Sequence, residues 1–525
     1  MTSLDGKNNK RVPRRRQSEL SKVGGLYRNI AYALAKLERY SAAAAHLEFN
    51  RTRILNEVLD LFHLREEQLD EESRARLKAV QRQVKKLEKE IRSLNLHPNN
   101  LDEEVLLGEY STQLRTARRD LVTIMEQVSP NGSEMNVAAI SAVAAGNAPL
   151  VYLITTPQGS LAIIIPAAVE TLQAKDVLWL DEFCQADLHH LLLNEQNGYL
   201  WGQIRGNVTL LKNALNQALP ILYSRLMKSL NNRLVERGYR RATLIPGGLL
   251  GVLPLHVAGP EDIIFGIAPS AKFLANAQQK IRKQSSPAPS LAAIGNPLPN
   301  ITPLPQARLE VEQISRYLPV EEQDILLETE ATLAKVLEAL AGKSYLHFSC
   351  HGMFDISDPL KSGLLLSGDD RLTLRDLLDG KANLSAARIA VLSACQTGVS
   401  DIQHTPDEVI GITAGFLQAG VPAVIGTLWS VDNRSTAMLM DLFYHYLLEE
   451  ELPPPEALLR AQKELSRTTI EALPEKYRSV HHNDATARAS KGGLTRAPKT
   501  ADASSKKYPY RHPYYWAAFF FTGAW

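Results

Sequence analysis

A histidine and a cysteine stand at corresponding points of two apolar segments of the chain. His351 comes directly after the run YLHFSC, residues 345–350, and is followed by a glycine. Cys395 ends the run IAVLSAC, residues 389–395, and Gly398 lies three positions further on. Short apolar runs of this length are typical of buried strands, so we expect both side chains where a strand ends.

This pair of residue types predicts nucleophilic catalysis. A cysteine beside an imidazole becomes a nucleophile because the imidazole assists the loss of the thiol proton. We therefore expect Cys395 to be the nucleophile and His351 its base. The oxyanion that forms needs backbone N–H donors aimed at it, and the amides of Gly352 and Cys395 are the natural candidates. A glycine also lets the backbone approach a substrate carbonyl closely.

Two other interpretations of these residues stay open. A buried cysteine is often a small apolar packing residue, and a histidine at a strand end is often a structural hydrogen-bond partner. A metal site is also conceivable, and it would draw on His347, Cys350, His351 and Cys395. Side chains alternate along a strand, however, so Cys350 would face away from the two histidines. The chain has no CxxC pair, and we expect no metal and no cofactor.

The segment from about residue 149 onward predicts an α/β sheet that would position this pair. It opens with two apolar runs around a Thr-Pro-Gln-Gly-Ser turn, which favours a β-hairpin. Residues 208–237 have the periodicity of a long helix, and short apolar strands then alternate with helices as far as residue 448. Such alternation is typical of a mostly parallel sheet with helices on both faces. Ligands bind beyond the carboxyl ends of its strands, where His351 and Cys395 would lie.

Residues 21–130 have helical periodicity instead. The stretch AYALAKLERYSAAAAHLE, residues 31–48, is similar to one tetratricopeptide helix pair, which cannot bury its own face without a neighbour. Six apolar residues then recur at spacings of three and four: Leu77, Val80, Val84, Leu87, Ile91 and Leu94. This short heptad seam is compatible with a helical hairpin packed within the chain or with dimerisation through a coiled coil.

Composition indicates a globular protein with basic segments near both ends. Of its 525 residues, 45% are hydrophobic and 22% charged, and the net charge is +2. Basic residues outnumber acidic ones in residues 1–20 and in residues 481–511, so the rest of the chain is net acidic. We expect 1–20 to be a disordered tail and about 475–508 a disordered loop. Direct nucleic-acid binding by the folded core is not expected.

Cysteine content and hydropathy predict a cytoplasmic protein that does not enter a membrane. The three cysteines, Cys184, Cys350 and Cys395, are too few and too scattered for a disulfide framework. They fit a reducing compartment. No apolar run approaches the roughly 20 residues that span a bilayer. The basic N-terminal segment has no apolar core after it, so it does not resemble a secretory signal.

Five segments, in this order, resemble the CHAT domain family of caspase-like, separase-related cysteine peptidases of clan CD. They are YLHFSCHGMFD, SGLLLSGDDRLTLRDL, IAVLSACQTG, DEVIGITAGFLQAGVPAVIGTLWSVDNRST and HPYYWAAFFFTGAW. The resemblance covers roughly residues 150–525, and the family is also associated with tetratricopeptide segments.

The resemblance implies an α/β caspase-like fold and a catalytic dyad of His351 and Cys395. Residues 149–290 would be a non-catalytic, pseudo-caspase part, and residues 291–525 the catalytic part. His256, in GVLPLHVAG, matches a family motif that we interpret as structural.

The resemblance also nominates residues that would bind the substrate side chain. Family relatives that cut after basic residues line the first subsite with a carboxylate, and separase has an acidic residue soon after a Leu-Trp pair. In GTLWSVDNRST this nominates Asp432, whereas Ser430 stands where separase has its aspartate. Asp407 and Glu408 are alternatives, although carboxylates there could instead favour the start of the following helix.

From these features we expect a cytoplasmic cysteine endopeptidase that cleaves protein substrates. A partner protein would regulate it through the helical N-terminal region. Many bacterial relatives are linked with defence or programmed cell death, and the resemblance extends that expectation to this chain. The alternative is a catalytically inactive, caspase-like interaction scaffold, because membership of a family does not establish turnover.

Overall fold

The chain divides into two units, Met1–Thr52 with Val137–Trp525, and Arg53–Asn136. The computed structural model describes residues 14–49, 136–474, 477 and 507–525, with gaps at 145–146, 195, 197, 260–261, 284–287, 300–303, 354, 356–358 and 395–410, and scattered positions between 71 and 116. Most of the predicted heptad seam and of the predicted loop 475–508 therefore lies outside the described residues. None of the described helices is long and apolar enough to cross a membrane.

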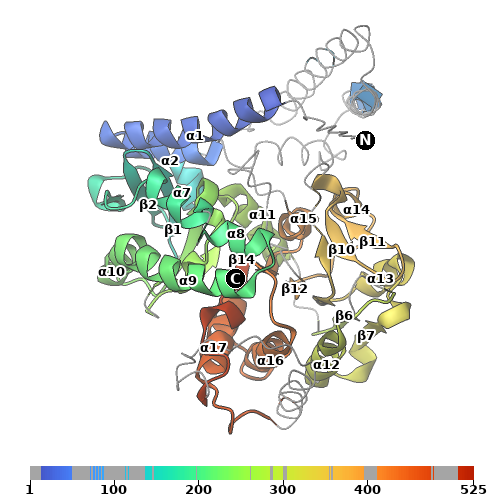
Figure 1. The fold of residues 1–525 in the computed structure, drawn as a ribbon. Helices are drawn as coiled ribbons and strands as arrows, with labels where there is room; N and C mark the ends of the chain where they lie inside the picture. The colour runs from blue at the N-terminus through green and yellow to red at the C-terminus, as the bar shows by residue number, and fades with distance from the viewer. Residues whose placement is uncertain are drawn as a thin grey trace, which may run out of the picture. The chain divides into compact units, whose positions relative to one another are not determined.

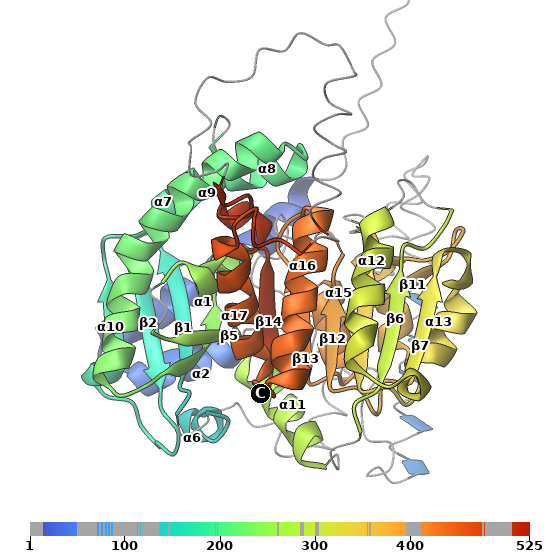
Figure 2. The same cartoon turned by 90° about the horizontal axis from the view of Figure 1, so that it is seen from below.

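One sheet of 11 strands forms the centre of the larger unit (Figure 2). Its order is β3 (Val177–Leu180), β2 (Gly159–Ile165), β1 (Leu150–Thr156), β4 (Arg241–Pro246), β5 (Ile264–Ile267), β14 (Phe519–Gly523), β13 (Ala423–Thr427), β12 (Ile389–Leu392), β8 (Tyr345–Ser349), β6 (Leu291–Gly295) and β7 (Gln323–Leu327). The predicted hairpin is confirmed, because β1 and β2 pair antiparallel from Leu150↔Ile165 to Thr156↔Gly159.

Beyond the antiparallel strands β2 and β3 at one edge, the sheet consists of two parallel sets of strands that meet at one antiparallel pair. In the first half β1, β4, β5 and β14 are mutually parallel. In the second half β13, β12, β8, β6 and β7 are mutually parallel. β13 and β14 pair antiparallel, from Ala423↔Gly523 to Thr427↔Phe519, and so join the two halves. The expectation of a mostly parallel sheet is confirmed.

Helices cover both faces of the sheet (Figures 1 and 2). On one face lie α7 (Gln185–Leu193), α9 (Val208–Leu222), α10 (Lys228–Glu236), α12 (Pro305–Ile314), α16 (Asn433–Tyr444) and α17 (Pro454–Arg467). On the other lie α1 (Arg14–Lys36), α2 (Tyr40–Phe49), α11 (Ala271–Lys283), α13 (Leu333–Leu340), α14 (Leu374–Leu378) and α15 (Ile412–Gln418). The predicted helix over 208–237 is present as α9 and α10, joined by a π-helical turn at Tyr223–Met227.

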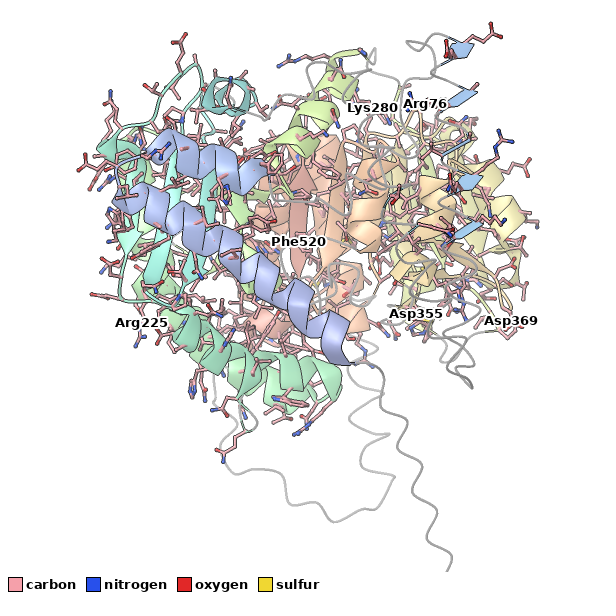
Figure 3. The ribbon with its side chains drawn as sticks, turned by 90° about the horizontal axis from the view of Figure 1, so that it is seen from above. Arg76, Arg225, Lys280, Asp355, Asp369 and Phe520 are labelled. Carbon is pink, nitrogen blue, oxygen red and sulfur yellow. The ribbon has the colours of Figure 1, made fainter. Side chains whose placement is uncertain are left out.

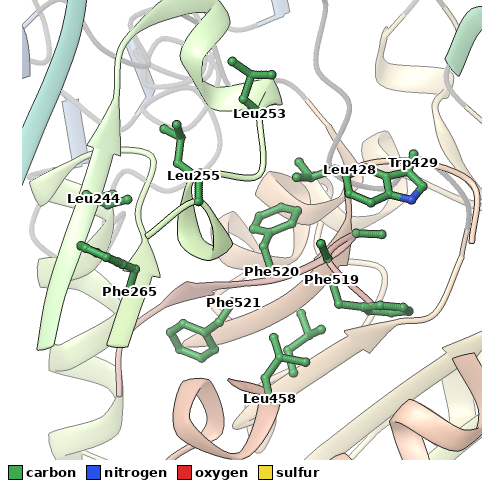
Figure 4. Close-up of a cluster of buried hydrophobic side chains, with 14 of the residues drawn as sticks. Leu244, Leu253, Leu255, Phe265, Leu428, Trp429, Leu458, Phe519, Phe520 and Phe521 are labelled. Atoms are coloured by element: carbon green, nitrogen blue, oxygen red, sulfur yellow. The ribbon is translucent and has the colours of Figure 1, made fainter. Parts of the chain in front are cut away.

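Alternating strand residues fill a separate core on each face, as the pleat of a sheet requires. One core surrounds the β13–β14 junction, where Trp429 and Phe519 are fully buried among apolar side chains (Figure 4). The indole N–H of Trp429 donates a hydrogen bond to the Tyr514 carbonyl at 3.0 Å. The other core packs Phe348 of β8 against Phe416 of α15, with ring centroids 5.5 Å apart. The ends of β8 and β12 are therefore packed on both sides.

The N-terminal helix pair packs on the first half of the sheet (Figure 3). Glu48 of α2 is 5% exposed, and its carboxylate accepts hydrogen bonds from the amides of Ala271 and Lys272, which begin α11, at 3.0 and 2.9 Å. The Tyr152 hydroxyl donates a third bond at 2.6 Å. The sheet thus covers a face that one helix pair cannot bury alone. α1 starts at Arg14, inside the segment 1–20 that the sequence predicts as a tail.

Candidate active site

The carboxyl ends of β8 and β12 lie side by side. The two strands are parallel neighbours, and their register pairs Phe348 with Leu392. His351 is three residues beyond Phe348, and Cys395 is three residues beyond Leu392. The strand ends that precede His351 and Cys395 in the sequence therefore lie side by side. Cys395 itself lies outside the described residues, which reach Ala394 on this strand.

A small second sheet holds the segment that contains His351. Directly after this residue the chain forms β9 (Gly352–Met353), which pairs antiparallel with β10 (Gly363–Leu365), and β10 pairs with β11 (Arg371–Thr373). The His351 carbonyl accepts a hydrogen bond from the Leu365 amide at 2.8 Å. His351 is partly exposed.

The neighbouring strand β13 holds the residues just before Cys395 through a hydrogen bond. Ser393 and Ala394 are 7% and 1% exposed. The Ala394 carbonyl accepts a hydrogen bond of 2.5 Å from the hydroxyl of Thr427, the last residue of β13. This bond anchors the backbone at the point where the chain enters Cys395.

Cys350 packs on the opposite side of β8 from His347. It is 1% exposed and belongs to the apolar core that contains Phe348 and Phe416, whereas His347 faces α12 and α16. The expected alternation of these side chains is confirmed. Among the described residues no group of three or more His, Cys, Asp or Glu side chains is arranged to hold a metal ion.

A buried polar network lies behind the ends of the strands. Glu310 of α12 accepts hydrogen bonds from His347 Nε2 at 2.9 Å and from the Ser349 hydroxyl at 3.0 Å. The Tyr444 hydroxyl of α16 lies 3.3 Å from His347 Nδ1. All four side chains are at most 3% exposed. Buried polar groups are costly unless they are paired, so this network ties α12 and α16 to β8.

A pocket of about 20 Å³ opens at the same strand ends. Two parts of the lining come from the end of β8 and from the residue that follows β12. The others come from α12 and the residue that precedes it, and from the start of α16. The lining residues are Leu304, Ala307, Glu310, Ser349, Cys350, Ser393, Val431, Asn433 and Thr436. The pocket therefore touches both chain segments that lead to His351 and Cys395.

Comparison with known proteins assigns the chain to a family. The family model described as the CHAT domain matches residues 217–524, more than half of the chain. The chain belongs to the CHAT domain family. No curated protein matches the sequence.

The CHAT domain is similar to solved structures at low sequence identity. One is the complex of the pro- and mature domains of RgpB from Porphyromonas gingivalis, with 13% identity, a TM-score of 0.33, and coverage of 59% of this chain and 68% of that one. Gingipain R, an Arg specific cysteine proteinase, matches at 9% identity and a TM-score of 0.34. The match covers 61% of this chain and 74% of that one. The separase–securin complex of Saccharomyces cerevisiae matches at 14% identity and a TM-score of 0.32. The match covers 73% of this chain and only 26% of that one.

The substrate-binding residues nominated from the sequence lie around the pocket of the CHAT domain or outside the described residues. Asp432 is the N-cap of α16, and its carboxylate accepts a hydrogen bond from the Ser435 amide at 3.0 Å. Its neighbours Val431 and Asn433 line the pocket, and Ser430 is exposed just before them. Glu408 and Asp407 fall within 395–410, outside the described residues. Whether these residues bind substrate stays a prediction.

Glu310 and Thr436 of the CHAT domain were not singled out from the sequence. Glu310 lies on the apolar stripe of α12, between the buried Ala307 and Ile314 at helical spacing. A carboxylate on such a stripe is a signal that a buried partner exists. Thr436 gives no such signal, because threonine is common on half-buried helix faces.

Proposed function

We propose that the chain is a cysteine endopeptidase in which Cys395 is the nucleophile and His351 the general base. The observation that carries this proposal is the parallel register of β8 and β12 in a CHAT domain, since these neighbouring strands end just before His351 and Cys395 in the sequence. A thiol and an imidazole that follow two neighbouring strand ends by three residues each would need little rearrangement to reach hydrogen-bond distance.

The proposed reaction is acyl transfer through a thioester. His351 takes the thiol proton of Cys395, and the thiolate attacks the carbonyl carbon of the scissile peptide. The tetrahedral oxyanion collapses, and the leaving amine departs with the proton from the imidazolium. Water, deprotonated by the same imidazole, then hydrolyses the thioester and releases the free enzyme.

The backbone at Gly352 suits the proposed role of oxyanion donor. His351 and Leu365 form a hydrogen-bonded pair between β9 and β10. Bonded and non-bonded pairs alternate along an antiparallel ladder, so the Gly352 N–H points away from β10. A donor with that orientation is available to a developing oxyanion, together with the amide of Cys395.

The remaining parts of the proposal concern substrate and regulation. Asp432, together with Ser430 two residues before it and Glu408 in the segment after Cys395, would favour a basic side chain before the scissile bond. A partner protein would act through the helical N-terminal region, in the cytoplasm of a bacterium that uses the enzyme in defence or programmed cell death.

Active-site labelling distinguishes a peptidase from an inactive scaffold. A peptide that carries a thiol-reactive warhead should modify Cys395 selectively, with Cys184 and Cys350 as internal controls mapped by mass spectrometry. His351→Ala should slow the labelling, because it removes the base that generates the thiolate. Labelling of Cys395 no faster than of a free thiol, and unaffected by His351→Ala, would favour the scaffold.

A further inference from the structure

The small sheet next to His351 has an open edge. Its strand order is β11, β10, β9, so among the described strands β9 pairs only with β10. β9 begins directly after His351, and both of its residues, Gly352 and Met353, are partly exposed. An edge strand presents N–H and C=O groups that can pair with a further strand. In the described part of the chain, β9 is therefore open to an added peptide.

The register of the small sheet shows which backbone groups face this edge. The His351 carbonyl accepts a hydrogen bond from the Leu365 amide at 2.8 Å, and Gly352 lies opposite Leu364. Bonded and non-bonded pairs alternate along an antiparallel ladder, so Gly352 directs both its N–H and its C=O away from β10. The proposed reaction uses the N–H as an oxyanion donor. It does not use the C=O, which is an acceptor on the open edge.

The same register places a positive charge on the face of the small sheet that carries His351. Leu365 of β10 lies opposite His351 on one side and opposite Arg371 of β11 on the other, so the three side chains share one face. The guanidinium of Arg371 lies 3.6 Å from Met353 Sδ, and it therefore extends across this face toward β9. Arg371 is exposed, and this sulfur is the only described hydrogen-bond or ion-pair partner of its guanidinium.

We propose that the substrate segment after the scissile bond pairs with β9 as an added parallel strand and places an acidic side chain beside Arg371. The proposal rests on the proposed peptidase function and names the class of its substrate. Peptides that add a strand to a sheet edge gain affinity from main-chain hydrogen bonds and specificity from alternate side chains. The Gly352 C=O supplies a main-chain acceptor, and Arg371 supplies a fork of donors that fits a carboxylate.

The proposed chemistry sets the direction and register of the added strand. The scissile carbonyl accepts from the Gly352 N–H. The residues before the bond belong to the region of Asp432, which leaves β9 to the residues after it. In a parallel pair, a residue donates to one residue of the neighbouring strand and accepts from the residue two positions further on. The Gly352 C=O therefore accepts from the amide of the second residue after the scissile bond.

The alternation of side chains puts this second residue on the face of Arg371. The first residue after the bond lies opposite Gly352, and the second lies opposite Met353 and shares its face. Neighbouring strands are about 4.8 Å apart, and the guanidinium already extends to Met353. A carboxylate on the second residue is therefore within reach of Arg371, whereas an ammonium there would be repelled.

Peptides that differ only at the second residue after the bond test the proposal on the full chain. With Arg before the bond and Glu, Gln or Lys at this position, kcat/KM should be highest for Glu, about fivefold lower for Gln and lower again for Lys, the scale of a partly exposed ion pair. N-methyl-Glu, which lacks the backbone donor, should lose about tenfold. N-methylation of the third residue, whose N–H points away from β9, is the matched control. Equal cleavage of the Glu, Lys and N-methyl-Glu peptides would overturn the proposal.

Arg371 offers a variant that separates recognition from folding. Arg371→Gln removes an exposed charge, so the thermal midpoint should hardly change. It should lower kcat/KM for the Glu peptide to that of the Gln peptide and leave the Gln peptide unaffected, while Arg371→Lys should retain part of the preference. Lys335→Gln, which removes an exposed positive charge from α13, is the control. Equal losses on the Glu and Gln peptides would contradict a role in recognition.

Binding to a variant without the nucleophile tests the edge of β9 apart from catalysis. In calorimetry, Cys395→Ala should bind the Glu peptide more tightly than the Lys and N-methyl-Glu peptides. If this order is found but the wild type cuts no peptide, the proposed function fails and the assignment of the edge stands. If peptides are cut without either preference, the assignment of the edge alone is wrong. Absence of both binding and cleavage would overturn both.

Discussion

At the scale of single residues, three side chains near the strand ends have different roles although they are close in sequence. Ser349 faces α12 and binds Glu310, Cys350 packs in the opposite core, and His351 reaches the partly exposed edge. The alternation of a strand separates the first two, and the turn into β9 exposes the third. Chemistry is therefore expected at His351 and not at Cys350.

Cys350 can be replaced without loss of the proposed catalysis. Cys350→Ala or Cys350→Val should keep kcat/KM for a peptide substrate within a fewfold, because the change alters packing only. The free energy of unfolding should fall by about 1–3 kcal/mol, measured by urea denaturation. Selective labelling of Cys350 by a peptide warhead, with Cys395 unmodified, would show that the assignment is wrong.

Asp432 has a cap role in the structure and a predicted role in substrate binding. Asp432→Asn should lower kcat/KM for basic peptides by about 100-fold, because a nearby carboxylate stabilises the cation by a few kcal/mol. Asparagine is as good an N-cap as aspartate, so stability and the alkylation rate of Cys395 should hardly change. If cleavage of basic peptides were unchanged, Asp432 would not bind substrate and would serve only as the N-cap of α16.

At the scale of elements, local patterns of the sequence predict what each segment forms but not which distant segment it meets. The strand at 345–349 follows from a mostly apolar run, and the helix at 374–378 follows from three leucines at helical spacing. The pairing of β13 with β14 joins residues about one hundred positions apart. Likewise, Glu310 of α12 forms its hydrogen bond with Ser349 of β8. Such contacts depend on the order of the strands in the sheet, and the periodicity of the sequence does not predict that order.

The docking of α2 on α11 should depend on the charge of Glu48. Glu48→Gln replaces one acceptor oxygen with a donor that faces the amides of Ala271 and Lys272. The loss of charge-assisted hydrogen bonds should lower the free energy of unfolding by about 2–3 kcal/mol. Glu38→Gln, at an exposed position between α1 and α2, is the matched control. If the two variants were equally stable, the carboxylate of Glu48 would not stabilise the docking of α2 on α11.

At the scale of the whole molecule, residues 519–523 complete the sheet. β14 lies between β5 and β13 and contacts both halves, and the Phe519 carbonyl accepts hydrogen bonds from His256 Nε2 at 2.8 Å and Gln462 Nε2 at 2.9 Å. The structural interpretation of His256 agrees with this contact. Burial lowers the pKa of His256 to about 4, since its Nδ1 is enclosed without a partner among the described residues.

Stability should decrease as the pH falls from about 6.5 to about 4. Burial also lowers the pKa of His512 to about 4, with the Lys212 charge adding to the effect. Above pH 6.5 both histidines are neutral in either state. Below it the unfolded chain binds protons that the folded chain does not, and this stabilises the unfolded state. Urea midpoints between pH 7 and 4.5 measure the effect.

His512→Asn provides the control for this pH dependence. Asparagine can still accept the hydrogen bond that the Tyr514 amide donates to His512 Nδ1, but it does not titrate. The variant should therefore lose less stability than the wild type over the same pH range. An identical pH dependence would mean that His512 titrates normally in the folded protein.

The most direct test of the central claim is mass-spectrometric mapping of cuts in a peptide library by the wild type, Cys395→Ala and His351→Ala. Each substitution should lower cleavage by about three orders of magnitude or more, and the double variant should lose little beyond that, because the two residues act as one unit. Retained cleavage by Cys395→Ala, with loss in Cys350→Ala, would contradict the account.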